Sequence, residues 1–231
     1  MSVILIVDDE PEIRKLIRIH MEDAGLQVIE AESGNEAIEC LREQSIDLVI
    51  LDLMMNNGNG FDVMNFLRNN EMRTIILALS ARREVHDKIT TLGYGADDYV
   101  TKPFSPQELL ARVQAHLRRH YPLSLIPPHT TNIKIHQLVL EVDNLVLYNE
   151  GKRYTLTQVE CDLLRLFMVN PDRILTKREI YKEIWQHENY DDNNLSVFVS
   201  RLRKLLNSST STHPYIQTVR GVGYRFSGDG L

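Results

Sequence analysis

The first half of the chain alternates between short apolar runs and amphipathic stretches. The apolar runs are rich in Val, Ile and Leu and predict buried strands near residues 3–7, 27–30, 47–52, 74–79 and 98–100. Helical stretches lie between them, and two begin with sequences typical of capping boxes, Ser33–Glu36 and Ser105–Glu108. Strands that alternate with helices over short links predict a doubly wound α/β domain with a parallel sheet.

The second half begins with the alternation typical of antiparallel strands. The predicted strands cover residues 133–135, 138–142, 145–147 and 152–156. Capping boxes at Thr157–Glu160 and Thr176–Glu179 start two helices, the first ending near Asn170, and a third helix is predicted over 193–206. Residues 215–226 complete an α+β domain with a hairpin that turns at glycines.

The third helix of this half has one apolar side. Leu195, Val199, Leu202 and Leu206 fall on a single stripe at helical spacing. On or near the other side we expect Asn193, Ser196, Val197, Ser200, Arg201, Arg203 and Lys204.

A segment with three prolines separates the two patterns. Pro122, Pro127 and Pro128 exclude a continuing helix and stiffen the chain. We therefore predict domains at residues 1–120 and 133–228, joined by a linker at 121–132.

Composition fits two domains and adds a charge asymmetry. The chain has 231 residues with two cysteines, Cys40 and Cys161, which leave no disulfide framework. With no sequence typical of a signal peptide or membrane span, we expect a cytoplasmic protein. Residues 1–121 hold 13 Lys and Arg against 20 Asp and Glu, a net charge of −7, whereas residues 122–231 hold 13 against 12, a net charge of +1.

Charged residues stand where three predicted strands end. Asp8 and Asp9 follow the first strand, Asp52 closes the third, and Lys102 follows the fifth. Because function in open α/β sheets collects beyond the carboxyl ends of the strands, we expect these side chains to converge. Crowded carboxylates favour a hard divalent cation, and that cation with a lysine suits a phosphoryl group. Taken alone, Asp8–Pro11 is an ordinary helix start and Asp52 a turn residue.

These residues occur in motifs that closely resemble the receiver domains of bacterial two-component response regulators. The motifs are Val7–Glu10, Leu51–Met55, Leu79–Ala81, Gly95–Tyr99 and Thr101–Phe104. The expected fold is a flavodoxin-like five-stranded parallel sheet of order 2-1-3-4-5, which places the first and third strands side by side.

The resemblance implies a role for each charged or polar residue of the site. Asp52 is the implied phosphoacceptor. Asp9, Asp52 and the carbonyl of Met54 are the implied holders of Mg²⁺, with Asp8 acting through water, and Mn²⁺ could substitute for Mg²⁺. Lys102 and Ser80 are implied to contact the phosphoryl group, and Ser80 and Tyr99 to act as the switch. Without the resemblance, Tyr99 would be interpreted as an aromatic residue at the edge of the core.

Residues 133–227 resemble the winged helix-turn-helix DNA-binding domains of the OmpR/PhoB family. The motifs are Leu156–Glu160, Ile184–Trp185, Val199–Lys204 and Thr218–Phe226. The resemblance implies base reading by Ser196, Val197 and Arg201, DNA-backbone contacts from Trp185, Arg203, Lys204 and Thr218, and minor-groove contact from Arg220. Asn193 and Ser200 are further expected DNA-binding residues. Taken alone, Trp185 would be a core residue, and Arg203 and Lys204 would complement the helix dipole.

The chain departs from both family patterns. Asn56 follows Met55 where relatives commonly have proline, and Asn193, Ser196 and Phe198 stand where they often have arginine, aspartate and histidine. The target sequence therefore does not transfer, and fewer positive groups predict a shallower salt dependence of DNA binding.

Activation is expected to form a homodimer. The implied pairs are Lys88 with Glu108, Asp97 with Arg112, and Asp98 with Arg119, the alternative being a solvated face. The expected partners are double-stranded DNA, a sensor histidine kinase, a second copy of the chain and, as a further candidate, RNA polymerase, with no membrane.

The favoured function is a phosphorylation-controlled transcription factor and not an enzyme. One alternative is a DNA-binding regulator that does not respond to phosphate. Another is a phosphatase-like enzyme that turns over at Asp52, but such enzymes normally have a second carboxylate two residues later, where Met54 stands.

Overall fold

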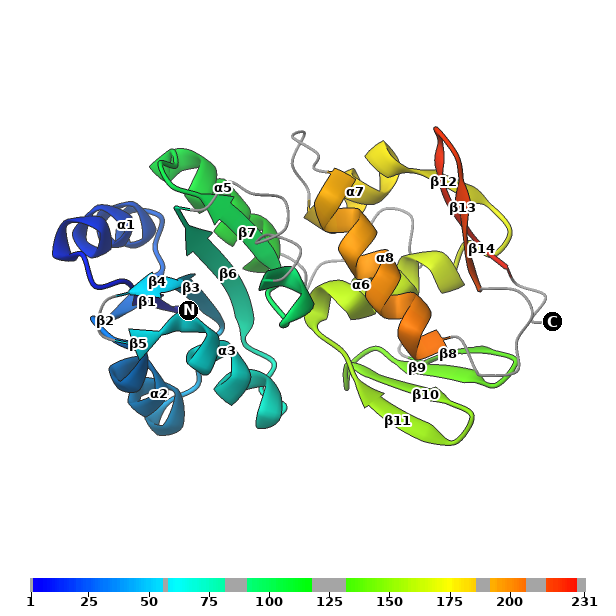
Figure 1. Ribbon diagram of the computed structural model, residues 1–231, viewed down its shortest axis with the longest axis horizontal. Helices are drawn as coiled ribbons and strands as arrows, with labels where there is room; N and C mark the ends of the chain where they lie inside the picture. The colour runs from blue at the N-terminus through cyan, green and yellow to red at the C-terminus, as the bar shows by residue number, and fades with distance from the viewer. Residues whose placement is uncertain are drawn as a thin grey trace. The chain divides into compact units, whose positions relative to one another are not determined.

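The chain divides into two units, Met1–Arg118 and Arg119–Leu231, in the computed structural model (Figure 1). The structure describes residues 2–55, 58–81, 91–117, 132–185, 192–206 and 215–227, with only the backbone of residues 58, 59, 192 and 193. Residues 121–131 of the predicted linker lie outside the described residues.

The first unit is built on a five-stranded parallel sheet of order β2-β1-β3-β6-β7. The strands are β1 (Val3–Val7), β2 (Gln27–Ala31), β3 (Leu48–Asp52), β6 (Ile75–Ser80) and β7 (Asp98–Thr101). Counted along the chain, this is the order 2-1-3-4-5, so the predicted flavodoxin-like fold is confirmed. A short hairpin of β4 (Met54–Met55) and β5 (Gly58–Asn59) follows β3 and was not predicted.

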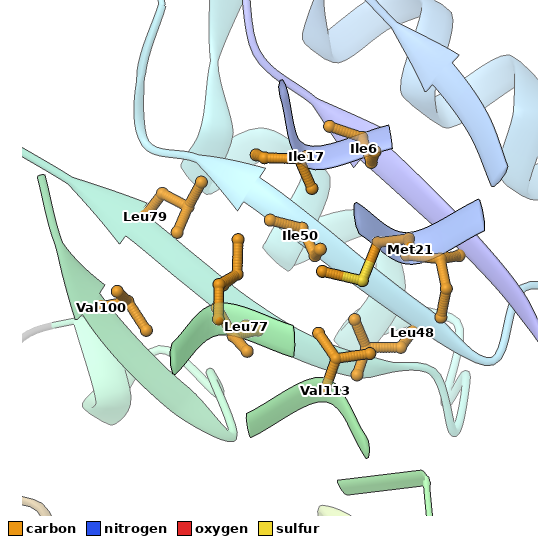
Figure 2. Close-up of a cluster of buried hydrophobic side chains, with 11 residues drawn as sticks. Ile6, Ile17, Met21, Leu48, Ile50, Leu77, Leu79, Val100 and Val113 are labelled. Carbon is orange, nitrogen blue, oxygen red and sulfur yellow. The ribbon is translucent and has the colours of Figure 1, made fainter. Parts of the chain in front are cut away.

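Helices cover both faces of this sheet. The described helices are α1 (Pro11–Asp23), α2 (Gly34–Glu43), α3 (Gly60–Asn69) and α5 (Pro106–Leu117), with α1 and α5 on one face and α2 and α3 on the other (Figure 1). Successive strand residues point to opposite faces, so Ile4 and Ile6 of β1 both pack toward α1 and α5. Figure 2 shows this cluster, in which Ile17 and Met21 of α1 and Val113 of α5 cover alternate residues of the central strands.

Two of the four predicted capping boxes are complete. Thr157 and Thr176 each accept a hydrogen bond from the glutamate amide three residues later and donate their own amide to that glutamate's carboxylate. At Ser33 the returning carboxylate of Glu36 binds the amide of Glu32 instead. At Ser105 the carboxylate of Glu108 turns to Arg112, so these two helices keep only half of the motif.

The described residues of the second unit form a sheet, three helices and a hairpin, which confirms the predicted winged helix-turn-helix. Its antiparallel sheet has the order β11-β10-β9-β8, formed by β8 (Asn132–Ile135), β9 (Leu138–Glu141), β10 (Val146–Asn149) and β11 (Lys152–Thr155). The helices are α6 (Gln158–Met168), α7 (Lys177–Trp185) and α8 (Asp192–Leu206), and the hairpin is β13 (Ile216–Val219) with β14 (Gly223–Phe226). In Figure 1, α8 crosses α6, and both pack with α7.

A strand that the sequence pattern did not predict joins the hairpin. Residues Ile174–Thr176 form β12, which pairs with β14 in a sheet of order β12-β14-β13. A Cβ at Gly223 would collide with the carbonyl of Leu175, so this close approach of two strands requires glycine there.

We expect Gly223→Ala to destabilise the second unit by about 1–3 kcal/mol, because one of the two strands must move. The fluorescence of Trp185, the chain's single tryptophan, reports unfolding of this unit in urea. Gly93→Ala, whose added Cβ meets nothing, is the control and should leave the transition in place. An unchanged midpoint in Gly223→Ala would contradict the packing argument.

Candidate functional site

Three carboxylates meet at one edge of the parallel sheet. Asp8 follows β1, and Asp52 ends β3, which lies beside β1 in parallel with Val7 opposite Leu51. Asp8 and Asp52 are buried, Asp9 is half-buried, and one carboxylate oxygen from each lies within 4.8 Å of the others. The predicted convergence is confirmed, and its cause is the pairing of two strands that are far apart in sequence.

Lys102 supplies the counter-charge. Its Nζ lies 2.8 Å from Asp8 Oδ2 and 2.6 Å from Asp52 Oδ2, and it lies 3.7 Å from the exposed carboxylate of Glu10. Burial tends to lower the pKa of Lys102, but the hydrogen bonds to Asp52 and Asp8 outweigh it and raise that pKa. For Asp8 burial prevails over the lysine and raises the carboxyl pKa.

Backbone amides hold the other oxygens of the two buried carboxylates. The amide of Glu10 donates to Asp8 Oδ1 at 2.9 Å, and the amide of Met54 donates to Asp52 Oδ1 at 2.8 Å. Each carboxylate is therefore fixed by one backbone bond and one lysine bond. Such fixed geometry favours positioning of a reacting group without reorganisation.

Gly60 lies directly against the backbone of Asp52. A Cβ at Gly60, the first residue of α3, would collide with the carbonyl of Asp52. Glycine therefore lets α3 begin directly against the end of β3.

Sequence reasoning missed Arg14. Its Nη1 donates to the carbonyl of Asp8 at 2.7 Å, and its Nε binds Glu30 at 3.3 Å. A cation near the N-terminus of α1 opposes the helix dipole, and that mismatch was the available signal that Arg14 has another partner.

Ser80 and Tyr99 lie on the neighbouring strands. Ser80 ends β6, is 2% exposed, and accepts a hydrogen bond from the amide of Lys102 at its carbonyl. It stands opposite Thr101 of β7, next to Lys102. Tyr99 on β7 is 3% exposed, so its ring is more buried than that of a residue at the edge of the core.

Asp97 and Asp98 are buried and paired within the chain. Asp97 accepts from Arg68 Nη2 at 2.9 Å and from the amide of Ile76 at 3.0 Å. Asp98 accepts from Arg112 Nη1 at 3.0 Å and lies 3.3 Å from His116 Nε2.

In this structure both carboxylates are paired within their own chain, and their predicted pairs across a dimer stay a prediction. Asp97 is 1% and Asp98 0% exposed, and a buried carboxylate is costly unless it is paired. Arg112 is engaged by Asp98 and by exposed Glu108, while Lys88 and Arg119 lie outside the described residues.

The exposed face of α8 is narrower than predicted. Ser196, Ser200 and Lys204 are exposed, as expected. Val197 is only 7% exposed, so its predicted place on this face is wrong. The reason is that α8 packs against both α6 and α7. Its buried side is therefore wider than the stripe of four leucine and valine positions. The side chain of Asn193 lies outside the described residues.

Trp185 is a core residue. Its side chain is 1% exposed, stacks on Tyr181 with ring centroids 4.5 Å apart, and lies 5.7 Å from the ring of Phe198. The predicted contact of Trp185 with a DNA backbone is therefore corrected: the indole is enclosed where α7 and α8 meet.

The two arginines of α8 are held by other elements of the unit. Arg201 Nε binds Glu160 Oε1 at 2.9 Å, with side-chain exposures of 24% and 3%. Arg203 donates to the carbonyl of Ile216 at 2.9 Å and to Thr218 Oγ1 at 2.8 Å, and so ties α8 to the hairpin. Sequence reasoning placed Glu160 in a capping box and in a family motif but missed its pairing with Arg201.

Thr218 and Arg220 of the hairpin are exposed, as their predicted roles require. Among the described residues, no helix is long and apolar enough to cross a membrane.

Comparison with protein-family models matches both halves of the chain. Residues 4–114 match the response regulator receiver domain, and residues 151–226 match the domain described as transcriptional regulatory protein, C terminal. The first range lies within predicted residues 1–120, and the second within 133–228.

Relatives are similar over nearly the full length. The regulatory protein VanR of Enterococcus faecium is 37% identical over 225 residues, covering 96% of this chain and 97% of VanR. The phosphate regulon transcriptional regulatory protein PhoB of Klebsiella pneumoniae is 36% identical over 227 residues, covering 97% of each.

Solved structures agree with the fold. The response regulator DrrB of Thermotoga maritima, an OmpR/PhoB homolog, has a TM-score of 0.53 at 26% identity and covers 98% of this chain and 99% of its own. A RitR mutant has a TM-score of 0.78 with the same coverage, but at 23% identity it supports the fold alone.

Proposed function

This chain belongs to the response regulator transcription factors of the OmpR/PhoB type, a family of regulators and not of enzymes, and we propose that phosphorylation of Asp52 by a histidine kinase controls its sequence-specific binding to DNA. The observation that carries the proposal is the pair of contacts from Lys102 Nζ to Asp8 and Asp52. They join the ends of three strands in one charged pocket.

The pocket suits transfer of a phosphoryl group to Asp52. A carboxylate oxygen attacks phosphorus, the bond from phosphorus to the donor's histidine nitrogen breaks, and the imidazole leaves with the electron pair. Lys102, which neutralises Asp52 before the reaction, then pairs with a phosphoryl oxygen, while the hydroxyl of Ser80 donates to another. Because the added charge is about −1.5 to −2, it biases the arrangement of the neighbouring segments, and Ser80 and Tyr99 are the proposed switch.

The donor set fits Mg²⁺. Receiver domains bind Mg²⁺ at an acidic cluster, and here Asp8, Asp9 and Asp52 offer hard oxygen ligands, two of them aligned by backbone amides. The carbonyl of Met54 is the further proposed ligand. When bound, the ion neutralises the incoming phosphoryl oxygens.

DNA recognition is proposed for the exposed face of α8 and for the hairpin. Ser196, Ser200 and Lys204 face outward on α8, and Thr218 and Arg220 on the hairpin. A helix with short polar side chains fits the major groove, and an exposed arginine on a hairpin suits the minor groove.

We expect beryllofluoride with Mg²⁺, a phosphoryl analogue, to increase the affinity of the full-length chain for its duplex by at least about tenfold, the change that a coupling of 1–3 kcal/mol produces. The duplex is obtained by in vitro selection from random sequence, and fluorescence anisotropy measures binding. The control is Asp52→Asn, which should not respond. Equal affinities with and without the analogue would favour the regulator that does not respond to phosphate.

Activation is proposed to form a homodimer. Two linked half-sites raise the apparent affinity of a weak dimer for DNA without new contacts within each half-site. Sedimentation of the same samples should show association with beryllofluoride. A monomer that persists and binds half-sites singly would contradict dimerisation.

A further inference from the structure

The side chains on the exposed row of α8 are of types that distinguish poorly between bases. Ser196, Ser200 and Lys204 are exposed and stand four residues apart, so they line one row of the helix. A serine hydroxyl donates to or accepts from several bases, and a lysine ammonium is a point charge without directional preference. A guanidinium is more selective, and Arg201 of the same helix stands next to this row.

Arg201 lies beside the row and is held by a carboxylate from another helix. Its Nε is 2.9 Å from Glu160 Oε1 of α6, and Figure 1 shows α8 crossing α6. The Arg201 side chain is 24% exposed, whereas that of Glu160 is 3% exposed. A guanidinium carries its N–H donors in a planar fork, so a bond from Nε to a fixed carboxylate orients the whole plane.

The charge of Glu160 is not needed for its capping role. Its Oε2 accepts from the amide of Thr157 at 2.8 Å, and Thr157 Oγ1 accepts from the amide of Glu160. Glutamine serves in a capping box as well as glutamate does. Since a buried carboxylate is costly unless it is paired, the pair with Arg201 accounts for the charge.

Other contacts fix the helix that carries Arg201. Asn149 of β10 donates to the carbonyls of Leu205 and Leu206 at the C-terminal end of α8, at 2.9 and 3.0 Å. Arg203 binds the hairpin through Ile216 and Thr218. Arg201 therefore projects from a backbone that is held at several points.

We propose that Glu160 is a positioning residue for base recognition: it holds the guanidinium of Arg201 in the orientation in which Arg201 contacts a base edge. This rests on the proposed function, in which α8 enters the major groove. A preoriented side chain loses less conformational freedom on binding. The planar fork pairs best with O6 and N7 of guanine, so the selected sequence should contain a guanine at the contacted position.

The test is Glu160→Gln in the full-length chain, because glutamine preserves the cap and removes the charge that orients Arg201. Binding is measured to the duplex selected with the wild-type chain and to the same duplex with its bases scrambled. We expect the ratio of the two affinities to fall roughly tenfold, within the range that one bidentate arginine–guanine contact provides, and the affinity for the scrambled duplex to be unchanged.

The matched control is Glu179→Gln. Glu179 forms the same capping box with Thr176 in α7 and an ion pair with Arg173, but neither contact involves α8. Glu179→Gln should keep the wild-type ratio of affinities for the selected and scrambled duplexes.

A double variant separates positioning from a general structural effect. If Glu160 acts through Arg201, adding Glu160→Gln to Arg201→Gln should cause no further fall in the ratio of affinities for the selected and scrambled duplexes. Arg201→Lys keeps the charge but lacks the planar fork, so it should also lower the ratio of the two affinities. This variant serves as the test if Glu160→Gln does not fold.

The proposal would be overturned if folded Glu160→Gln, or Arg201→Lys, kept the wild-type ratio of affinities for the selected and scrambled duplexes. It would also be overturned if the two substitutions lowered this ratio independently in the double variant. A wild-type chain that selects no sequence would instead remove the proposed function itself.

Discussion

Replacing Asp52 by asparagine is expected to abolish labelling of the full-length chain by acetyl phosphate. An amide oxygen is not a nucleophile toward phosphorus, so the acyl phosphate cannot form. Asparagine still offers an oxygen to the amide of Met54, which in the wild type donates to Asp52 Oδ1, so the local backbone should persist. Intact mass with peptide mapping measures the extent and the position of the label.

The control for this experiment is Asp62→Asn, an exposed carboxylate on α3, which should label as the wild type does. Labelling of Asp52→Asn at the wild-type extent would remove the central claim. A label that maps to Asp8 or Asp9 would show that the pocket, and not the particular carboxylate, directs the reaction.

Asp98→Asn is expected to destabilise the first unit by about 3–5 kcal/mol at neutral pH, because it removes the carboxylate of a buried ion pair and leaves Arg112 and His116 enclosed. Asp98 is 0% exposed, and Arg112 Nη1 and His116 Nε2 both contact it. Urea unfolding followed by far-UV circular dichroism measures the loss.

Two controls locate the effect of this substitution. Glu108→Gln removes the exposed partner of the same arginine and should cost only about 0–1 kcal/mol. Trp185 lies in the second unit, so its fluorescence transition should stay in place. If Asp98→Asn and Glu108→Gln lowered the free energy of unfolding equally, burial would not be what makes the Asp98 pair stabilising.

The same carboxylate gives a pH dependence with a defined sign. Burial alone would raise the pKa of Asp98, but the Arg112 guanidinium and the His116 imidazole outweigh burial and hold that pKa well below its usual range. A lowered pKa stabilises the folded state above the unfolded value of about 3.9, and this stability is lost as the pH falls toward the folded value. We therefore expect acid below about pH 4 to destabilise the wild type more steeply than Asp98→Asn.

The pocket was predictable because its residues occupy local positions with a regular geometry. Asp8, Asp52 and Lys102 each follow or end an apolar strand run, and parallel strands deliver their carboxyl ends to one edge. The alternation of strands and helices therefore brought Lys102 into contact with Asp52 and Asp8, as expected. These residues lie 50 and 94 positions before Lys102 in the chain.

The partners of buried charges were not predictable in the same way. The identity of Asp98 does not reveal whether it faces solvent or Arg112, since both choices are compatible with a strand that begins there. Val197 was placed on the wrong side because a helix that packs against two others buries more than one stripe. Strand β12 escaped prediction because its three residues form a strand only by pairing with β14.

The sequence by itself determined the order of elements, the two-domain plan and the convergence of Asp8, Asp9, Asp52 and Lys102, since periodicity and strand ends are local properties of the chain. Only the tertiary structure decided which charges are enclosed and which face solvent. Pairing between Glu160 and Arg201, or between Asp98 and Arg112, depends on how elements distant in sequence pack, and on the cost of leaving a charge without a partner once water is excluded.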